Sequence, residues 1–252
     1  MSEAPILFEE LPAASGKVGR VTLNVPATLN SLTLEMVDLL QAQLDAWRED
    51  GEIGSVFIEG SGEKAFCAGG DVQALHASAT ATPGGPCDYA ERFFTREYRM
   101  NYTLHTYPKP IVCWGHGIVM GGGLGVMAGC SHRVVTEATR IAMPEVTIAL
   151  VPDVGGSWFL NHMPGKSGHF LALTGASINA ADAVYTGLAD RFVASEHREA
   201  VLAQLCQQDW AADNEVNHGL VRHVLRSFAE ESIGSCPAGQ VEPHMGTIAR
   251  LC

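Results

Sequence analysis

The stretch PKPIVCWGHGIVMGGGLGVMAGC, residues 108–130, decides how the rest of the chain is interpreted. Residues 111–130 contain seven glycines and no charged side chain apart from a possible charge on His116, so the stretch resembles a membrane-spanning helix. Each glycine, however, disfavours a helix by about 1 kcal/mol relative to alanine. Three consecutive glycines at 121–123 therefore favour a buried strand, a turn lined by main chain, and a helix.

The composition also indicates a compact folded protein. Of the 252 residues, 46% are hydrophobic and 17% are charged, which argues against disorder and against low-complexity classes. The chain has 16 basic and 28 acidic side chains, a net charge of −12, so binding to a nucleic-acid backbone is not expected. An anionic ligand would have to be held by local groups.

Neither cysteines nor histidines form a recognisable metal or disulfide pattern. The seven cysteines include no C-x-x-C pair and are odd in number, which predicts free thiols in a reducing compartment. His218 and His223 are five residues apart, and no HExxH or GxSxG motif occurs. The first twenty residues show no secretory signal, so we expect a cytoplasmic protein that binds neither metal nor membrane.

Strand and helix patterns alternate along the chain and then become mostly helical. The hydrophobic periodicity predicts strands at 19–25, 55–60, 108–115 and 190–194, and two short strands within 132–144. It predicts helices from Ser31 or Thr33 to Trp47, from Val72 after the cap Asp71, and from Tyr89 to about His105. Residues 78–88 are expected to form a loop. Beyond Val154 the pattern is mainly helical. This order predicts an α/β fold with a helical C-terminal region.

Two glycine turns, FCAGGD at 66–71 and GIVMGGGLG at 117–125, each follow an apolar strand and lead into a helix. The first N–H groups of a helix are free donors, and glycine lets a ligand approach the main chain. Two such turns facing one point would form an oxyanion hole for a carbonyl oxygen. Alternatively, the glycines only permit tight packing of strand against helix.

A dinucleotide-binding interpretation of the second turn is less favoured. Gly123, Gly125 and Ala128 fit G-x-G-x-x-A, and Glu145 lies about twenty residues further on. The preceding strand ends near Cys113 or Trp114, however, too far upstream of the first glycine, and Glu145 follows a proline instead of ending a strand.

Three acidic residues are candidates for proton transfer. Glu145 and Asp153 lie in MPEVTIALVPDVGG, residues 143–156, where an apolar setting would raise a carboxyl pKa toward neutrality. The alternative is that Glu145 caps a turn and Asp153 caps a helix beginning at Val154. On its own, Glu97 in TREYRMN is more typical of a solvated helix residue.

Five motifs in order resemble the crotonase (enoyl-CoA hydratase/isomerase) superfamily. They are VTLNVPATLNSLTLEMV (21–37), KAFCAGGDV (64–72), YPKPIVCWGHGIVMGGGLG (107–125), AMPEVTIALVPDVGG (142–156) and LTGASINAADAVYTGLAD (173–190). Within this superfamily the chain is most similar to the 3-hydroxyisobutyryl-CoA hydrolases, because it has FFTREY, GGGLG without a following Glu, and PDVGG. The resemblance implies a crotonase-like core of repeated strand-strand-helix units over 1–193 and a helical region over 194–252 that is shorter than in the family. It also implies an acyl-CoA substrate, no separate cofactor and a possible homo-oligomer.

The resemblance also assigns site residues. Gly70 and Gly122 correspond to the family's two oxyanion donors, Glu145 to its catalytic Glu, and Ala68, Glu97 and Asp153 to substrate-contacting residues. In hydratases a second catalytic Glu occupies the position of Gly125, and PGAGG replaces PDVGG. Hydration by a pair of glutamates is therefore not expected here.

The resemblance fails at the residues that hold the CoA phosphates. Family members often have a basic residue in N-R-P-K-x-L-N, where this chain has Val25 and Thr28. We therefore expect Lys64, Lys109 or backbone groups to bind the phosphates. The expected activity is hydrolysis of a short 3-hydroxyacyl-CoA, by analogy 3-hydroxyisobutyryl-CoA in valine breakdown. The alternatives are an enoyl-CoA hydratase or isomerase of the same fold and a non-catalytic acyl-CoA-binding protein.

Overall fold

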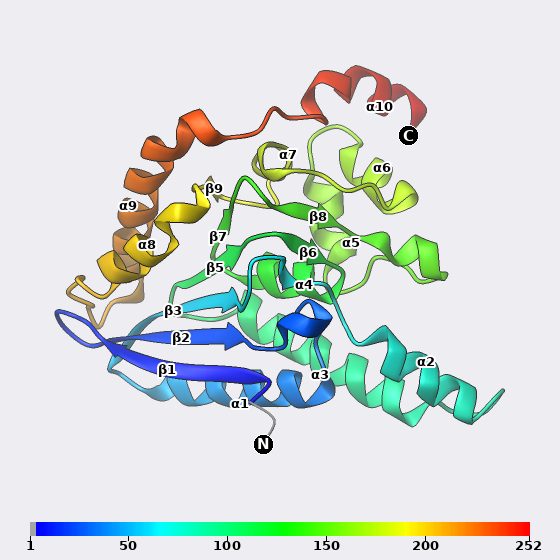
Figure 1. The fold of residues 1–252 in the computed structure, drawn as a ribbon, viewed down its shortest axis with the longest axis horizontal. Coiled ribbons are helices and arrows are strands. Elements are labelled where there is room, and N and C mark those ends of the chain that lie inside the picture. Colours follow the sequence, from blue (N-terminus) through cyan, green and yellow to red (C-terminus); the bar gives the residue numbers. More distant parts are fainter. Residues whose placement is uncertain (1–3) are drawn as a thin grey trace.

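A six-stranded sheet forms the centre of the fold (Figure 1), which the computed structural model describes over residues 4–252. In spatial order its strands are β1 (Ile6–Pro12), β2 (Lys17–Leu23), β3 (Ile53–Gly60), β5 (Ile111–Gly115), β7 (His132–Val135) and β9 (Arg191–Phe192). The pairing of β1 with β2 is antiparallel, and all the other pairings are parallel. Every residue of β3 is buried, as the apolar run at 55–60 predicts.

A second, smaller parallel sheet contains β4 (Ala65–Cys67), β6 (Ile118–Met120) and β8 (Arg140–Ala142). The chain passes from the large sheet to the small one and then into a helix each time: β3 leads to β4, β5 to β6, and β7 to β8. This alternation confirms the predicted α/β fold of repeated strand-strand-helix units. It also brings the ends of β4 and β6 side by side, since these strands pair directly.

Helices follow each pair of strands and make up the C-terminal part of the chain. They are α1 (Leu34–Glu49), α2 (Val72–Ala81), α3 (Asp88–His105), α4 (Gly122–Gly129), α5 (Gly156–Phe159), α6 (Ser167–Thr174), α7 (Ala180–Thr186), α8 (Arg198–Leu205), α9 (Asn214–Ser232) and α10 (Met245–Leu251). Short 3-10 helices are η1 (Pro26–Thr28), η2 (Pro144–Ile148), η3 (Leu160–His162), η4 (Ser195–His197), η5 (Ile233–Ser235) and η6 (Glu242–His244). In Figure 1, α2 projects from the body of the molecule.

Alternating side chains of the large sheet build two separate cores. Phe57, Val112 and Trp114 pack on one face with α8 and α9. Ile58 and Cys113 point to the opposite face, where they belong to the core that includes α1, α3 and α4. The period-two pattern of the strands thus explains why helices cover both faces (Figure 1).

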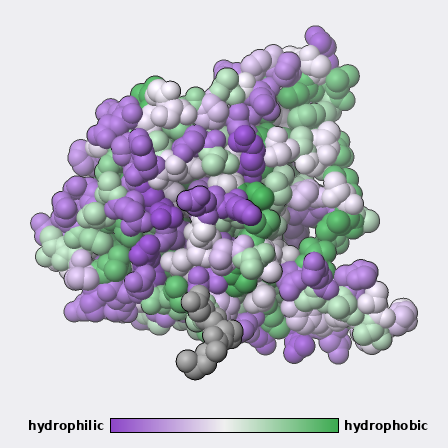
Figure 2. Space-filling view, viewed as in Figure 1, coloured by the Kyte–Doolittle hydropathy of each residue, from purple (hydrophilic) through white to green (hydrophobic). Residues whose placement is uncertain are grey.

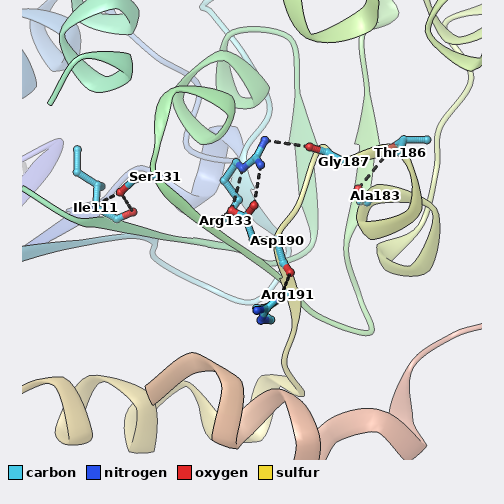
Figure 3. Close-up of polar contacts among 8 residues, drawn as sticks. All are labelled: Ile111, Ser131, Arg133, Ala183, Thr186, Gly187, Asp190 and Arg191. Carbon is cyan, nitrogen blue, oxygen red and sulfur yellow. Dashed lines mark hydrogen bonds and ion pairs between the residues drawn. The ribbon is translucent and has the colours of Figure 1, made fainter. Parts of the chain in front are cut away.

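An ion pair fixes the last strand of the sheet. Arg133 in β7 forms two hydrogen bonds to the carboxylate of Asp190, at 2.7 and 3.0 Å, and a third to the carbonyl of Gly187 (Figure 3). Bidentate pairing of this kind is geometrically specific. It holds the segment that leads into β9 against β7, although β9 itself contains only two residues.

Apolar side chains gather on one side of the surface. Figure 2 shows mainly polar residues over α8 and α9, and more hydrophobic ones on the side of α5 and α6. Among the exposed apolar residues are Ile148 at the end of η2, Leu150 and Val151 just after it, and Trp158 and Leu173.

Most predicted elements are present, and the differences have local causes. Thr33 and Asp71 cap α1 and α2 through hydrogen bonds to Met36 and Ala74. The loop predicted at 78–88 is wrong over 78–81, because α2 continues through these small residues until just before Pro83. The helix expected from Val154 begins at Gly156. The sequence patterns do not predict β1, β4 or β6, since β1 is a half-exposed edge strand and β4 and β6 are only three residues long.

Asp182 joins the C-terminal segment to the core. Its Oδ1 accepts hydrogen bonds from the N–H groups of Gln240 and Val241, both at 2.7 Å, and it completes a capping box with Asn179 at the start of α7. The side chain is fully buried. Residues 194–252 are helical as expected, and the domain boundary at 193/194 stays a prediction.

We expect Asp182→Ala to lower the free energy of unfolding by about 3 kcal/mol, because it leaves buried N–H groups without an acceptor. Urea unfolding followed by circular dichroism measures this loss. Asp213→Ala is the matched control: Asp213 also caps a helix, but it is exposed, so the expected loss is about 1 kcal/mol. Equal losses in the two variants would contradict the role given to Asp182.

Candidate active site

All six site residues that the family resemblance assigns line one cavity of about 90 Å³. It lies where the turns after β4 and β6 meet α3 and the segment from Pro144 to Asp153. The six are Ala68, Gly70, Glu97, Gly122, Glu145 and Asp153. Residues from four distant parts of the chain therefore converge on one point.

The two glycine turns are in direct contact. A Cβ at Gly123 would overlap the carbonyl oxygen of Cys67, and a Cβ at Gly69, which has φ +109°, would lie 3.5 Å from the nitrogen of Gly122. No larger residue fits between these backbones. The packing explanation of the glycines is therefore correct for Gly123, and it does not exclude a role for the neighbouring N–H groups.

The N–H groups of Gly70 and Gly122 are available to a ligand. Across residues 4–252, neither donates a hydrogen bond to the protein. The nitrogen of Gly70 lies 3.3 Å from the place where a Cβ of Gly122 would be, so the two donors border the same small space. The N–H of Ala68 is already bonded to Leu29, and any polar contact of Ala68 with a ligand would involve its carbonyl oxygen.

Glu145 enters the cavity from η2. Pro144 begins this 3-10 helix, which puts the Glu145 side chain against the second glycine turn, with Oε1 2.9 Å from a Cβ built on Gly121. Its Oε2 is buried without a hydrogen-bond partner. Burial, and to a lesser degree the charge of Asp153, raises the pKa of Glu145 to about 7.

Glu97 points from α3 into the same space and is only 2% exposed, so the alternative of a solvated helix residue is wrong. Its Oε1 has no partner and would overlap a Cβ at Gly122. Burial, followed by the charges of Asp153 and Glu145, raises the pKa of Glu97 to about 8. At neutral pH this carboxyl is mainly protonated.

Asp153 accepts a hydrogen bond from Tyr98, a residue that the sequence patterns do not indicate. The hydroxyl of Tyr98 donates to its Oδ2 at 2.6 Å. Asp153 does not cap a helix, since the residue preceding α5 is Gly155. The available signal for Tyr98 was its position directly after Glu97 in FFTREY, but adjacent helix residues usually face different directions.

The space beside Gly125 is filled. A Cβ at this position would lie 2.5 Å from the Cβ of Val154, so no longer side chain fits while Val154 keeps its place. Gly125 and Val154 together line a second, larger cavity next to the first.

One of the two lysines expected to hold phosphates is excluded from this role. The Nζ of Lys109 is buried and donates to the carbonyls of Trp47 and Asp50 at the end of α1. A cation there satisfies terminal carbonyls that the helix leaves unpaired. Lys64 is exposed and lines a separate pocket with Pro26 and Gly62, so it stays a candidate.

The histidines form no metal site. His132 and His218 are hydrogen-bonded to each other at 3.1 Å, and burial lowers the pKa of His132 to about 4. Within residues 4–252 no three His, Cys, Asp or Glu side chains are grouped for metal binding. In the same range, no helix has the length and apolar character needed to cross a membrane.

The comparisons with known proteins agree on the family of this chain. The profile of the enoyl-CoA hydratase/isomerase family matches residues 18–252. A protein named 3-hydroxyisobutyryl-CoA hydrolase, mitochondrial, from Danio rerio is 46% identical over 227 residues, which cover 90% of this chain and 56% of the relative. Its Homo sapiens counterpart is 39% identical over 241 residues, 95% of this chain and 60% of the relative.

A solved structure is similar over nearly all of the chain. The carnitinyl-CoA dehydratase from Mycobacterium thermoresistibile is 38% identical, with a TM-score of 0.84 over 98% of this chain and 66% of that structure. The chain thus spans less than two thirds of the length of each of these proteins.

The raised pKa of Glu97 predicts a pH-dependent cost to folding. Because the folded state holds this proton more tightly than the unfolded chain does, the stability it contributes is lost as pH rises from about 4.5 to about 8. Glu97→Gln cannot ionise, so we expect it to match the wild type near pH 4 and to exceed it by roughly 4 kcal/mol at pH 8.

Urea unfolding at several pH values measures this difference. Glu91→Gln is the control, since Glu91 lies exposed on the same helix and should show no such pH dependence. A constant difference between Glu97→Gln and the wild type from pH 4 to pH 8 would show that Glu97 ionises normally.

Proposed function

The chain belongs to the enoyl-CoA hydratase/isomerase family, and from that premise we propose that it hydrolyses a short 3-hydroxyacyl-CoA, with 3-hydroxyisobutyryl-CoA as its substrate. The acyl-CoA substrate is consistent with the family. The acyl group is taken from the names of the two relatives given above and from the acidic cavity.

In the proposed reaction the thioester oxygen accepts hydrogen bonds from the N–H groups of Gly70 and Gly122. These donors stabilise the negative charge that forms on the oxygen when a nucleophile adds to the carbonyl carbon. The nucleophile is either the carboxylate of Glu145 or a water molecule that Glu145 deprotonates. The tetrahedral intermediate then collapses, and the C–S bond breaks.

The protonated carboxyl of Glu97 gives its proton to the departing sulfur in this scheme. Its pKa of about 8 keeps it in the acid form at the pH where Glu145, with a pKa of about 7, is largely ionised. If Glu145 attacks directly, water afterwards hydrolyses the acyl–Glu145 anhydride and releases the acid.

The contact between Gly125 and Val154 is the observation that favours hydrolysis over hydration. Adding water across a double bond needs a base for the water and an acid for the α-carbon, and the hydratases resembled here supply the second group from position 125. Since Val154 fills that space, the position has neither a carboxylate nor room for one. One structural neighbour is a carnitinyl-CoA dehydratase, so hydratase-type chemistry is the alternative that an assay has to test.

Binding of the CoA phosphates by Lys64 is part of this proposal. Location and oligomeric state stay predictions: we expected a cytoplasmic protein, whereas the names of the relatives place those proteins in mitochondria.

We predict that Glu145→Gln lowers kcat by a factor of about 10² or more, the scale of a lost general base or nucleophile, without lowering the free energy of unfolding. In the wild type, kcat/KM should fall about tenfold per pH unit below pH 7, because the carboxylate must be ionised. Release of CoA thiol from 3-hydroxyisobutyryl-CoA measures both effects, and exposed Glu91→Gln is the control. Near-normal turnover by Glu145→Gln would remove this residue from the mechanism.

A second assay separates the three candidate functions. We expect thiol release from 3-hydroxyisobutyryl-CoA and little loss of enoyl absorbance from crotonyl-CoA. Rapid hydration of crotonyl-CoA without thiol release would replace the hydrolase proposal with a hydratase. Tight binding of both esters without either reaction would indicate an acyl-CoA-binding protein.

A further inference from the structure

The hydrogen bond from Tyr98 to Asp153 is not needed for the steps proposed above, although it is among the shortest in the site. The phenolic oxygen lies 2.6 Å from Oδ2 of Asp153. The two residues are 55 positions apart in the sequence, one on α3 and the other just before α5. A hydrogen bond from a neutral donor to an ionised acceptor is stronger than one between neutral groups.

Tyr98 remains a donor at any working pH. Burial, and then the hydrogen bond to Asp153, raises the pKa of the phenol well above its usual range. The hydroxyl proton therefore stays on Tyr98 and points at Oδ2. This leaves Asp153 with one oxygen engaged and the other, Oδ1, without a partner among residues 4–252.

Asp153 lies at the boundary of two cavities. It lines the catalytic cavity with Gly70, Gly122 and Glu145, and it also lines the neighbouring cavity of about 440 Å³. An acyl chain whose thioester oxygen is held by Gly70 and Gly122 passes Asp153 if it extends from the first cavity toward the second.

The other two carboxyls are less suited to accept a hydrogen bond from the acyl group. Glu97 is mainly protonated at neutral pH, and its Oε1 is next to Gly122, where the thioester would lie. Glu145 is required for attack on the carbonyl carbon in the proposed mechanism. Oδ1 of Asp153 accepts no hydrogen bond from residues 4–252, so it can accept one from a hydroxyl on the acyl chain.

We propose that Tyr98 is a positioning residue that fixes Asp153 as the acceptor for the 3-hydroxyl group of the substrate, so that the pair selects hydroxylated over unsubstituted acyl groups. This inference rests on the proposed function and assigns the specificity of the same site. The hydroxyl donates its hydrogen bond to Oδ1, while Tyr98 prevents the carboxylate from rotating away. A site built to bond a hydroxyl discriminates against the ligand that lacks it, because its own polar group is then left unpaired.

The test compares binding of 3-hydroxyisobutyryl-CoA with that of isobutyryl-CoA, which differs only by the hydroxyl. Calorimetry in the Glu145→Gln background measures both dissociation constants while turnover is slow. With Tyr98 present we expect the hydroxylated ester to bind about tenfold or more tightly than isobutyryl-CoA. Adding Tyr98→Phe should reduce this ratio to about one to three, chiefly by weakening the hydroxylated ester.

Tyr102→Phe is the matched control. Tyr102 lies one turn further along α3, is 69% exposed, and its hydroxyl forms no hydrogen bond within the described residues. It should leave the binding ratio unchanged. Asp153→Ala should abolish the preference as Tyr98→Phe does, because no carboxylate oxygen is then left to accept the hydrogen bond of the substrate hydroxyl.

Two results would overturn the inference. One is a Tyr98→Phe variant that weakens both esters equally, which would give Tyr98 a merely structural role. The other is the absence of any preference for the hydroxylated ester when Tyr98 is present. Failure of the proposed hydrolysis is a separate outcome, since absence of thiol release by the wild type leaves the two dissociation constants measurable.

Discussion

The contact between the turns that end β4 and β6 is the constraint on which the rest of the site depends. These strands pair directly in the small sheet, so their C-terminal ends meet, and the main chain of Gly123 presses against the carbonyl of Cys67. Only glycine permits this approach. It directs two main-chain N–H groups to one place without any side chain, so the donors are as rigid as the sheet that carries them.

Three acidic side chains surround these donors, and burying them opposes folding. Glu97, Glu145 and Asp153 line a cavity of about 90 Å³, and two of them have carboxyl oxygens that are buried without a partner. Such groups cost free energy unless they hold a proton or bind a ligand. The fold tolerates these carboxyls because the surrounding core is extensive. Their raised pKa values also favour the protonated form, which is less costly to bury. This arrangement gives an acid and a base at the same pH.

The sequence predicted the fold more fully than the site. Hydrophobic periodicity and the caps Thr33 and Asp71 located the main helices, because these signals are local. The resemblance pointed to the six cavity residues, whereas the residues alone left Glu97 as a surface residue, since burial by a distant turn has no local signature. The same reason explains the error at Lys109 and the omission of Tyr98, whose partners lie 59 to 62 and 55 positions away.

The contact between Gly125 and Val154 also bears on how this site could change during evolution. A glutamate introduced at 125 by a single substitution would collide with Val154, 2.5 Å from the new Cβ. A smaller residue at 154 has to come first, and by itself it brings no new reaction. The two positions are thus epistatic, and only one order of substitutions is open. A descendant of this chain would reach a two-glutamate site through an intermediate with a smaller core residue at 154, and not by one adaptive step.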